Sequence, residues 1–367
     1  MKKSFVHLLL ISIFLSVAIT TASAQLSTTP GSPRISTAAT QVANLLATLP
    51  EADALIYVNP RRILNDAAPR VVPPADVTKM RAAFADLKTT VGVDPSSIDY
   101  FVIALRFHKP AGDLSFVPPE VIGVVSGDFS SDSLLTMARL SLQDKMRDEK
   151  HGTRTMAITK IDPVASAAEK TPFLKSFSEV GFVSLSANSI AFGSIGYLKA
   201  AMDAADGTGR ISGDTVSSLL RDPNALISAA GSPLASFAKS FGLLGTQTTA
   251  RESRCDTTFG NFYTAITFDG NSFSIRGAMN ADNPDSAKII NGLFSGLLQQ
   301  AATSVPDKSA QNVLSNLKLA AKDNEVVLTA DIPAQMVADL IRERTKPAPK
   351  VEAKSPVRMK RTVRRKT

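Results

Sequence analysis

The side chains that most often carry catalysis or bind metals are scarce in this sequence. Histidine occurs three times, and once an N-terminal segment containing His7 is removed, only His108 and His151 remain. A structural zinc site needs three or four nitrogen or sulfur ligands, and a Ser-His-Asp triad needs a histidine as its base. His151 lies in a charged run typical of a turn, and no G-x-S-x-G nucleophile motif is present. We therefore predict no bound transition metal, no cofactor and no activity that depends on either histidine.

Cys255 is the single cysteine, so the chain cannot form an intramolecular disulfide. It lies in the polar stretch Arg251–Asp256, which is typical of an exposed loop. An unpaired surface thiol is the simplest interpretation. A functional thiol, or a disulfide to another molecule, stays open as an alternative.

Two stretches match the S-x-x-K pattern of penicillin-recognising enzymes, Ser236–Lys239 and Ser315–Lys318. In those enzymes the lysine lies one helical turn from the serine and helps to activate it. The companion Lys-Thr-Gly element is absent, and Lys318 falls on an expected strand. Because matches of four residues arise by chance, we predict no nucleophile at Ser236 or Ser315.

Three other stretches superficially suggest nucleotide or calcium binding. Gly207–Gly213 lacks the dinucleotide-binding spacing and follows a helical pattern, so a linker is the better interpretation. Asp269-Gly270-Asn271 and Asp323-Asn324-Glu325 do not continue into a twelve-residue calcium loop, and both stand where a hairpin must turn. The paired carboxylates of a glycoside hydrolase need no local motif, but with four Tyr and no Trp the chain has few aromatic platforms for sugars. The sequence thus predicts no catalytic, cofactor-binding or metal-binding residue.

The first 24 residues have the order of a secretory signal peptide. Lys2 and Lys3 precede an apolar run from Val6 to Ile19, and Ala22-Ser23-Ala24 supplies the small residues of a cleavage site. A spanning helix needs about 20 continuous apolar residues, which this run does not reach. We predict cleavage between Ala24 and Gln25 and export of a soluble protein to the periplasm or the extracellular medium.

The positive charge of the chain is concentrated in its last 23 residues, 345–367. Without that tail and without Lys2 and Lys3, 30 of the 41 basic and 32 of the 33 acidic residues remain, so the body is close to neutral. Three prolines and few large apolar residues predict that the tail is disordered, as is the lead-in at residues 25–34. We expect the tail to contact an anionic envelope polymer or lipid surface, with no specific nucleic acid as partner. The basic side chains that would make this contact are Lys346, Lys350, Lys354, Arg358, Lys360, Arg361, Arg364, Arg365 and Lys366.

Between these termini the sequence alternates strand-like and helix-like patterns. Alternating apolar residues predict hairpins that turn at Ala187-Asn188, Asp269-Gly270 and Asp323-Asn324, and each is followed by a helical pattern. The sequence therefore predicts an α+β fold, with an antiparallel sheet built from repeated hairpin-plus-helix units and with helices on one face of it. A body of this length favours two similar halves, residues 35–206 and 207–344, divided at the polar stretch Asp206–Arg210.

Two phrases, Asp53–Asn59 after a Leu-Pro and the passage around Phe192-Gly193-Ser194, resemble uncharacterised exported bacterial proteins of unknown function. The resemblance implies an exported α+β body and brings no active site with it. Taken together, these features favour a non-enzymatic binding or structural envelope module with a cationic tail. The alternative is a hydrolase whose active site is assembled from dispersed residues.

Overall fold

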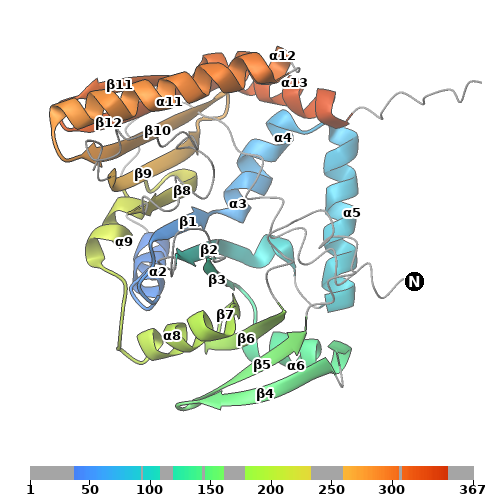
Figure 1. The fold of residues 1–367 in the computed structure, drawn as a ribbon. Coiled ribbons are helices and arrows are strands. Elements are labelled where there is room, and N and C mark those ends of the chain that lie inside the picture. The colour runs from blue at the N-terminus through green and yellow to red at the C-terminus, as the bar shows by residue number, and fades with distance from the viewer. Residues whose placement is uncertain are drawn as a thin grey trace, which may run out of the picture.

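The computed structural model describes residues 37–91, 94–107, 119–142, 145–160, 178–232, 259–305 and 308–345. Within these ranges one sheet of 12 strands runs in the order β11-β12-β10-β9-β8-β1-β2-β3-β7-β6-β5-β4 (Figure 1). All neighbouring pairs in it are antiparallel. The strands are β1 (Ala54–Val58), β2 (Ile98–Arg106), β3 (Glu120–Gly127), β4 (Met146–His151), β5 (Arg154–Lys160), β6 (Glu179–Ser186), β7 (Ser189–Gly193), β8 (Ala225–Gly231), β9 (Phe259–Phe268), β10 (Ser272–Ala281), β11 (Lys318–Lys322) and β12 (Glu325–Pro333).

Helices connect and cover these strands. They are α2 (Thr37–Leu46), α3 (Pro60–Arg62), the π-helical η1 (Ile63–Ala67), α4 (Ala68–Val71), α5 (Pro74–Val91), the 3-10 helix η2 (Pro95–Ser97), α6 (Ser131–Leu142), α8 (Ile195–Ala205), α9 (Gly213–Leu219), α11 (Pro284–Ser304), α12 (Lys308–Ser315) and α13 (Ala334–Thr345). None of the helices in the described ranges is long and apolar enough to cross a membrane.

The α+β class and the single antiparallel sheet agree with the sequence, and the three predicted hairpins are present. They are β6–β7, β9–β10 and β11–β12. Gly270 (φ 102°) and Asp323 (φ 51°) occupy the left-handed region that tight hairpin turns require. The residues at these two turns therefore fix which residues pair in the β9–β10 and β11–β12 hairpins, as expected.

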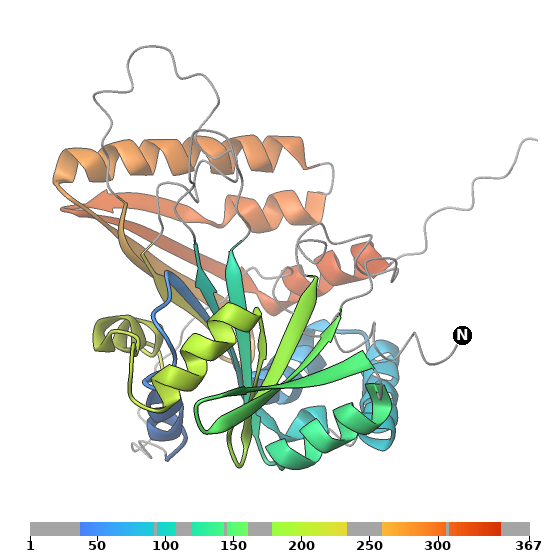
Figure 2. The same cartoon turned by 60° about the horizontal axis from the view of Figure 1, so that its bottom comes forward.

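The expectation that helices cover one face of the sheet is wrong, because they pack on both (Figure 2). Cross-strand partners share a face, so the paired series Val58, Phe101 and Val125 marks one of them. This face continues into the core beneath η1, α4, α12 and α13. The other face, marked by Leu55 and Val102, packs against α2, α8 and α9. The central strands are apolar at consecutive positions, and such strands need cover on both sides.

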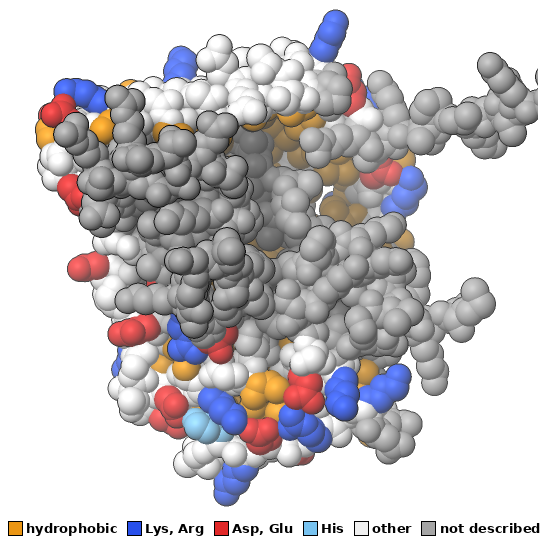
Figure 3. All heavy atoms as spheres, viewed as in Figure 1, with side chains coloured by type: hydrophobic (Ala, Val, Ile, Leu, Met, Phe, Trp, Pro, Cys, Tyr) orange, Lys and Arg blue, Asp and Glu red, His pale blue; other side chains and the backbone are white. Residues whose placement is uncertain are grey.

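The charged run that ends at His151 was expected to be a turn, and it is the edge strand β4 instead. Among the described strands β4 pairs with β5 alone, and charged residues occupy most of its positions, along an edge where polar side chains discourage pairing with other chains. Charges of both signs are intermixed around this end of the molecule (Figure 3). Because these residues are charged, the alternation of apolar residues that predicted other strands is absent from β4.

The stretch Asp206–Arg210 is a turn that follows α8 and lies against the residues before β1. The amide of Glu51 donates to the carbonyl oxygen of Gly209 (3.2 Å), and the amide of Ile211 donates to that of Leu49 (2.9 Å). β1 pairs with β8, so the sheet is continuous past this stretch. Two similar halves on either side of it stay a prediction.

Candidate functional site

Of the candidate catalytic residues that sequence reasoning weighed and set aside, the structure describes His151, Ser315 and Lys318, and these three lie on separate elements in surface positions. His151 Nε2 lies 2.8 Å from Asp203 Oδ1 on α8, in a half-exposed surface pair. Ser315 is the last residue of α12 and donates to the carbonyl oxygen of Asn312 (2.8 Å), whereas Lys318 begins β11. The two therefore do not lie on one helical turn. Over the ranges that the structure describes, no three His, Cys, Asp or Glu side chains gather as metal ligands.

Several residues of the sequence predictions lie outside the described residues. They are the cleavage pair Ala24 and Gln25, together with His108, Ser236, Lys239, Cys255 and the nine basic residues of the tail.

A pocket of about 590 Å³ opens between the helical segment that follows β1 and the β9–β10 turn. The helical segment supplies Arg62, Asn65, Asp66, Pro69 and Arg70. The turn supplies Phe268, Asp269 and Gly270. Elements far apart in the sequence therefore form one polar wall and one partly apolar wall.

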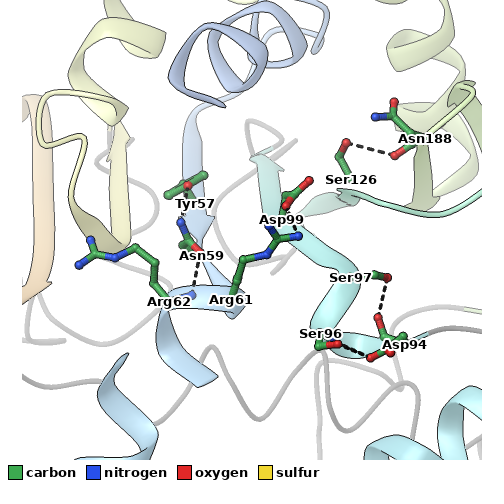
Figure 4. A network of polar contacts seen from close by, with 10 residues as sticks. All are labelled: Tyr57, Asn59, Arg61, Arg62, Asp94, Ser96, Ser97, Asp99, Ser126 and Asn188. Atoms are coloured by element: carbon green, nitrogen blue, oxygen red, sulfur yellow. Dashed lines mark hydrogen bonds and ion pairs between the residues drawn. The ribbon is translucent and has the colours of Figure 1, made fainter. Parts of the chain in front are cut away.

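The helical wall is fixed at its start by Asn59, which follows the last residue of β1. Asn59 Oδ1 accepts a hydrogen bond from the amide of Arg62 (3.0 Å), and Asn59 Nδ2 donates to Tyr57 Oη (3.4 Å; Figure 4). Pro60 at the first helical position needs no hydrogen-bond acceptor for its nitrogen. Asn59 thus caps the helix, and both the oxygen and the nitrogen of its side-chain amide form hydrogen bonds.

The two arginines after Pro60 point in different directions (Figure 4). Arg61 Nη2 lies 2.6 Å from Asp99 Oδ1 at the start of β2. Arg62 turns toward the pocket, where its Nε donates to Asp66 Oδ2 (3.0 Å) and its Nη1 donates to the carbonyl oxygen of Asn224. The ion pair of Arg61 and the cap at Asn59 therefore hold Arg62 at the mouth of the pocket.

The segment then passes through the π-helical turn η1, in which Ala67 is buried while Asn65 and Asp66 stay exposed. A π-helical turn adds one residue to the ordinary helical repeat and changes which side chains share a face. Ala67 and Val71 anchor the inner side of this segment in the core. The polar side chains consequently remain on the pocket side.

The opposite wall is the β9–β10 turn. Asp269 Oδ1 accepts hydrogen bonds from the amides of Asn271 (2.8 Å) and Ser272 (2.7 Å), which fixes this carboxylate. Phe268 packs against Phe273 with ring centroids 4.5 Å apart. This wall places one aromatic ring and one hydrogen-bonded carboxylate at the pocket.

Two polar side chains of the pocket form no side-chain hydrogen bond or ion pair with a described residue. They are Arg70 and Asn65, and both are exposed. The pocket lining contains no Ser, Thr, Cys, His or Lys, so none of the usual nucleophiles or nitrogen bases stands in it. The arrangement is suited to holding a polar ligand, and its acidic groups are the carboxylates of Asp66 and Asp269.

Tyr57 and Tyr100 lie behind the cap, with stacked rings whose centroids are 6.4 Å apart. Burial raises the pKa of both phenols, so both stay protonated at neutral pH. Near them Ser126 Oγ donates to the carbonyl oxygen of Asn188 (3.1 Å; Figure 4). The two tyrosines and the Ser126–Asn188 hydrogen bond therefore connect β1, β2, β3 and the β6–β7 turn near the start of the helical wall.

Sequence reasoning weighed Asp269 and Gly270 only as a calcium-like stretch and a hairpin turn. It singled out no residue of the helical wall, which begins after β1 at the dipeptide Asn59-Pro60. The dipeptide is also a cap followed by a first-turn proline, which is a helix-start signal. The pairing of Arg70 with Asp269 in one pocket had no local signal, because about 200 residues of chain lie between them.

No protein-family model and no curated protein matches the chain. Among solved structures it is similar to TP0453 in three crystal forms. Form III matches at 12% identity and a TM-score of 0.43 over 81% of this chain and 97% of that chain. Form IV matches at 9% and 0.43, covering 81% and 95%, and form I at 10% and 0.40, covering 81% and 96%. At TM-scores below 0.5 this likeness carries no argument about function.

Proposed function

We propose that the chain is an exported, non-enzymatic binding protein and that the pocket lined by Arg62 and Arg70 holds its ligand. The observation that carries this proposal is the guanidinium of Arg70, which has no partner among the described residues and lies on a pocket wall whose neighbouring groups are hydrogen-bonded. Sites for small ligands typically combine a concave surface, some apolar area and a few positioned polar groups. The pocket has each of these, with Phe268 as the apolar element.

The test is ligand capture from a small-molecule extract of the producing cells, with bound compounds identified by mass spectrometry. The wild-type chain should retain a compound that the Arg70→Met variant loses. Arg276→Met is the matched control, because Arg276 is exposed on β10 and faces away from the pocket side of the sheet. Retention of the same compounds by all three proteins, or of none by the wild type, would count against the proposal.

A hydrolase remains the second candidate, since Asp66 and Asp269 line the same pocket and paired carboxylates are the catalytic groups of glycoside hydrolases. Both carboxylates are already engaged, Asp66 with Arg62 and Asp269 with two turn amides. This supports binding over catalysis. Turnover of a captured compound by the wild type, abolished in Asp66→Asn, would reverse that preference.

We further propose that the basic tail attaches the exported body to an anionic envelope polymer or lipid surface. The body is near neutral in charge, and the nine basic residues after α13 form the strongest charge concentration in the chain. The pocket and the tail would then have separate roles, ligand binding and attachment.

The repeated-unit architecture is also a proposal. Its support is that β1-β2-β3 and β8-β9-β10 are both three-strand meanders, each flanked by a later strand, β7 beside β3 and β12 beside β10. The two sets of strands differ in their helices, because α8, which follows β7, and α13, which follows β12, pack on opposite faces of the sheet.

A further inference from the structure

We propose that the ligand of this pocket is a small zwitterion, a free amino acid or a dipeptide with both termini unblocked. The inference rests on the proposed binding function and specifies its ligand class. Its first support is the charge balance of the pocket, in which Arg62 and Arg70 stand against Asp66 and Asp269. A ligand of net charge would meet two like charges at the pocket. A ligand that is neutral overall and carries both signs meets complementary charges at both ends.

Arg70 is the group that would receive the carboxylate. Its guanidinium is planar and presents donors in a fork that matches both oxygens of a carboxylate. Arg62 shares the pocket but already donates to Asp66 and to the carbonyl oxygen of Asn224. The arginine available for an incoming carboxylate is therefore Arg70, and Asn65 contributes an amide to the same wall.

Asp269 is the group that would receive the ammonium. Its Oδ1 is held by the amides of Asn271 and Ser272, and its Oδ2 accepts no hydrogen bond from a described residue. A carboxylate fixed in this way keeps an open acceptor in a known position. It belongs to the turn, whereas Arg70 belongs to the helical wall, so the two ligand ends would contact opposite walls.

The volume and lining of the pocket limit the rest of the ligand. A volume of about 590 Å³ falls within the common range of small-ligand sites, roughly 300 to 1,000 Å³. Phe268 is the one aromatic residue among the lining residues, which suits a small apolar side chain better than a stacked sugar. A polyanion would place added negative charge beside Asp66 and Asp269, which disfavours phosphorylated ligands.

The experiment compares four probes of nearly equal shape by isothermal titration calorimetry on the full mature chain. They are alanyl-alanine, its N-acetyl derivative, its C-terminal amide, and the compound blocked at both ends. The zwitterion should bind at least tenfold more tightly than each blocked form. Equal binding of the doubly blocked compound, or tighter binding of the N-acetyl anion, would overturn the inference.

Two variants assign the two ends of the ligand. Arg70→Met should abolish the preference for the free carboxylate over the amide and leave the preference for the free ammonium. Asp269→Asn should do the reverse, and its amide oxygen can still accept from the turn amides. Arg276→Met should change neither preference, and equal thermal unfolding of the variants would show that each is folded. Unchanged preferences in both pocket variants would also overturn the inference.

The outcomes separate this inference from the binding function itself. If no probe binds while the extract yields a compound whose capture depends on Arg70, the zwitterion assignment is wrong and the binding function stands. If no probe binds and no compound is captured, both are wrong.

Discussion

Arg61 and Asp99 form an ion pair, with Nη2 2.6 Å from Oδ1, that joins the first turn after β1 to the start of β2. The pair spans two neighbouring strands of the sheet centre and lies beside the cap at Asn59 (Figure 4). Because Arg61 is held in this direction, the next side chain along the helix, Arg62, is directed to the pocket. A contact of this kind positions groups more than it stabilises the fold.

The stability contribution of the Arg61–Asp99 pair should consequently be small. Its side chains are 49% and 41% exposed, and exposed pairs are typically worth about 0 to 1 kcal/mol. A double-mutant cycle with Arg61→Ala and Asp99→Ala, measured by urea unfolding, should give a coupling free energy below about 1 kcal/mol. A coupling above about 2 kcal/mol would show that the pair is a structural anchor instead.

Gly193, at the end of β7, should be one of the most sensitive glycines of the fold. Its φ is 149°, and an added Cβ would overlap the backbone carbonyl oxygen of Val121 on β3. Gly193→Ala should lower the free energy of unfolding by roughly 1 to 3 kcal/mol, since that backbone cannot shift without breaking sheet pairing. Gly292→Ala is the matched control, because nothing lies within 4 Å of a Cβ there and it should raise stability by roughly 0.5 to 1 kcal/mol in a helix. Equal effects of the two substitutions in chemical denaturation would contradict this.

Asp94 should give the fold an acid-sensitive contribution. The hydroxyl of Ser96, the ammonium of Lys88 and the amide of Ser96 all lower the pKa of this carboxyl below its ordinary 3.8. A lowered pKa in the folded state means that the stabilisation is complete above the ordinary pKa of 3.8 and is lost as the pH falls through the folded value. Asp94 lies close to solvent, so the effect should stay below about 1 kcal/mol.

Asp94→Asn is the substitution that isolates this effect, because asparagine also caps helices but does not ionise. Unfolding free energies of the wild type and the variant should differ more at pH 7 than at pH 2, with the change falling below pH 4. Parallel curves over that range would show that the carboxylate charge contributes nothing.

The sequence predicted the parts of the sheet in which two stretches of alternating apolar residues are separated by turn-forming residues. Asn188, Gly270 and Asn324 mark such turns, and all three hairpins formed there. β4 was missed because an edge strand carries charges instead of apolar residues, and the helix positions on both faces depend on packing that local patterns do not record. Strand order is likewise tertiary information, since β1 pairs with β8 across more than 160 residues.

The candidate site could not be predicted from local sequence patterns, because its residues come from distant segments. Arg70 and Asp269 are ordinary surface residues in their own segments, and only the pairing of β8 with β9, beside β1, brings their segments together. The π-helical turn η1 likewise has no recognisable pattern in the stretch Ile63–Ala67. A pocket built from common residue types on distant segments becomes visible only in the fold.

The basic tail should determine attachment of the body to anionic surfaces. Nine Lys and Arg among 23 residues, spaced by prolines, can each contribute roughly 1 kcal/mol near an anionic membrane. Full-length mature protein should sediment with vesicles containing phosphatidylglycerol at low salt and be released at high salt, because a screening length of about 8 Å at physiological salt already weakens exposed charges. A chain that ends at Arg344 should stay in the supernatant in both conditions. A full-length variant with all nine basic residues replaced by Gln, which keeps the length and the prolines, should behave like the shortened chain. Binding of the shortened and full-length proteins to the same extent, independent of salt, would show that the attachment surface lies on the folded body.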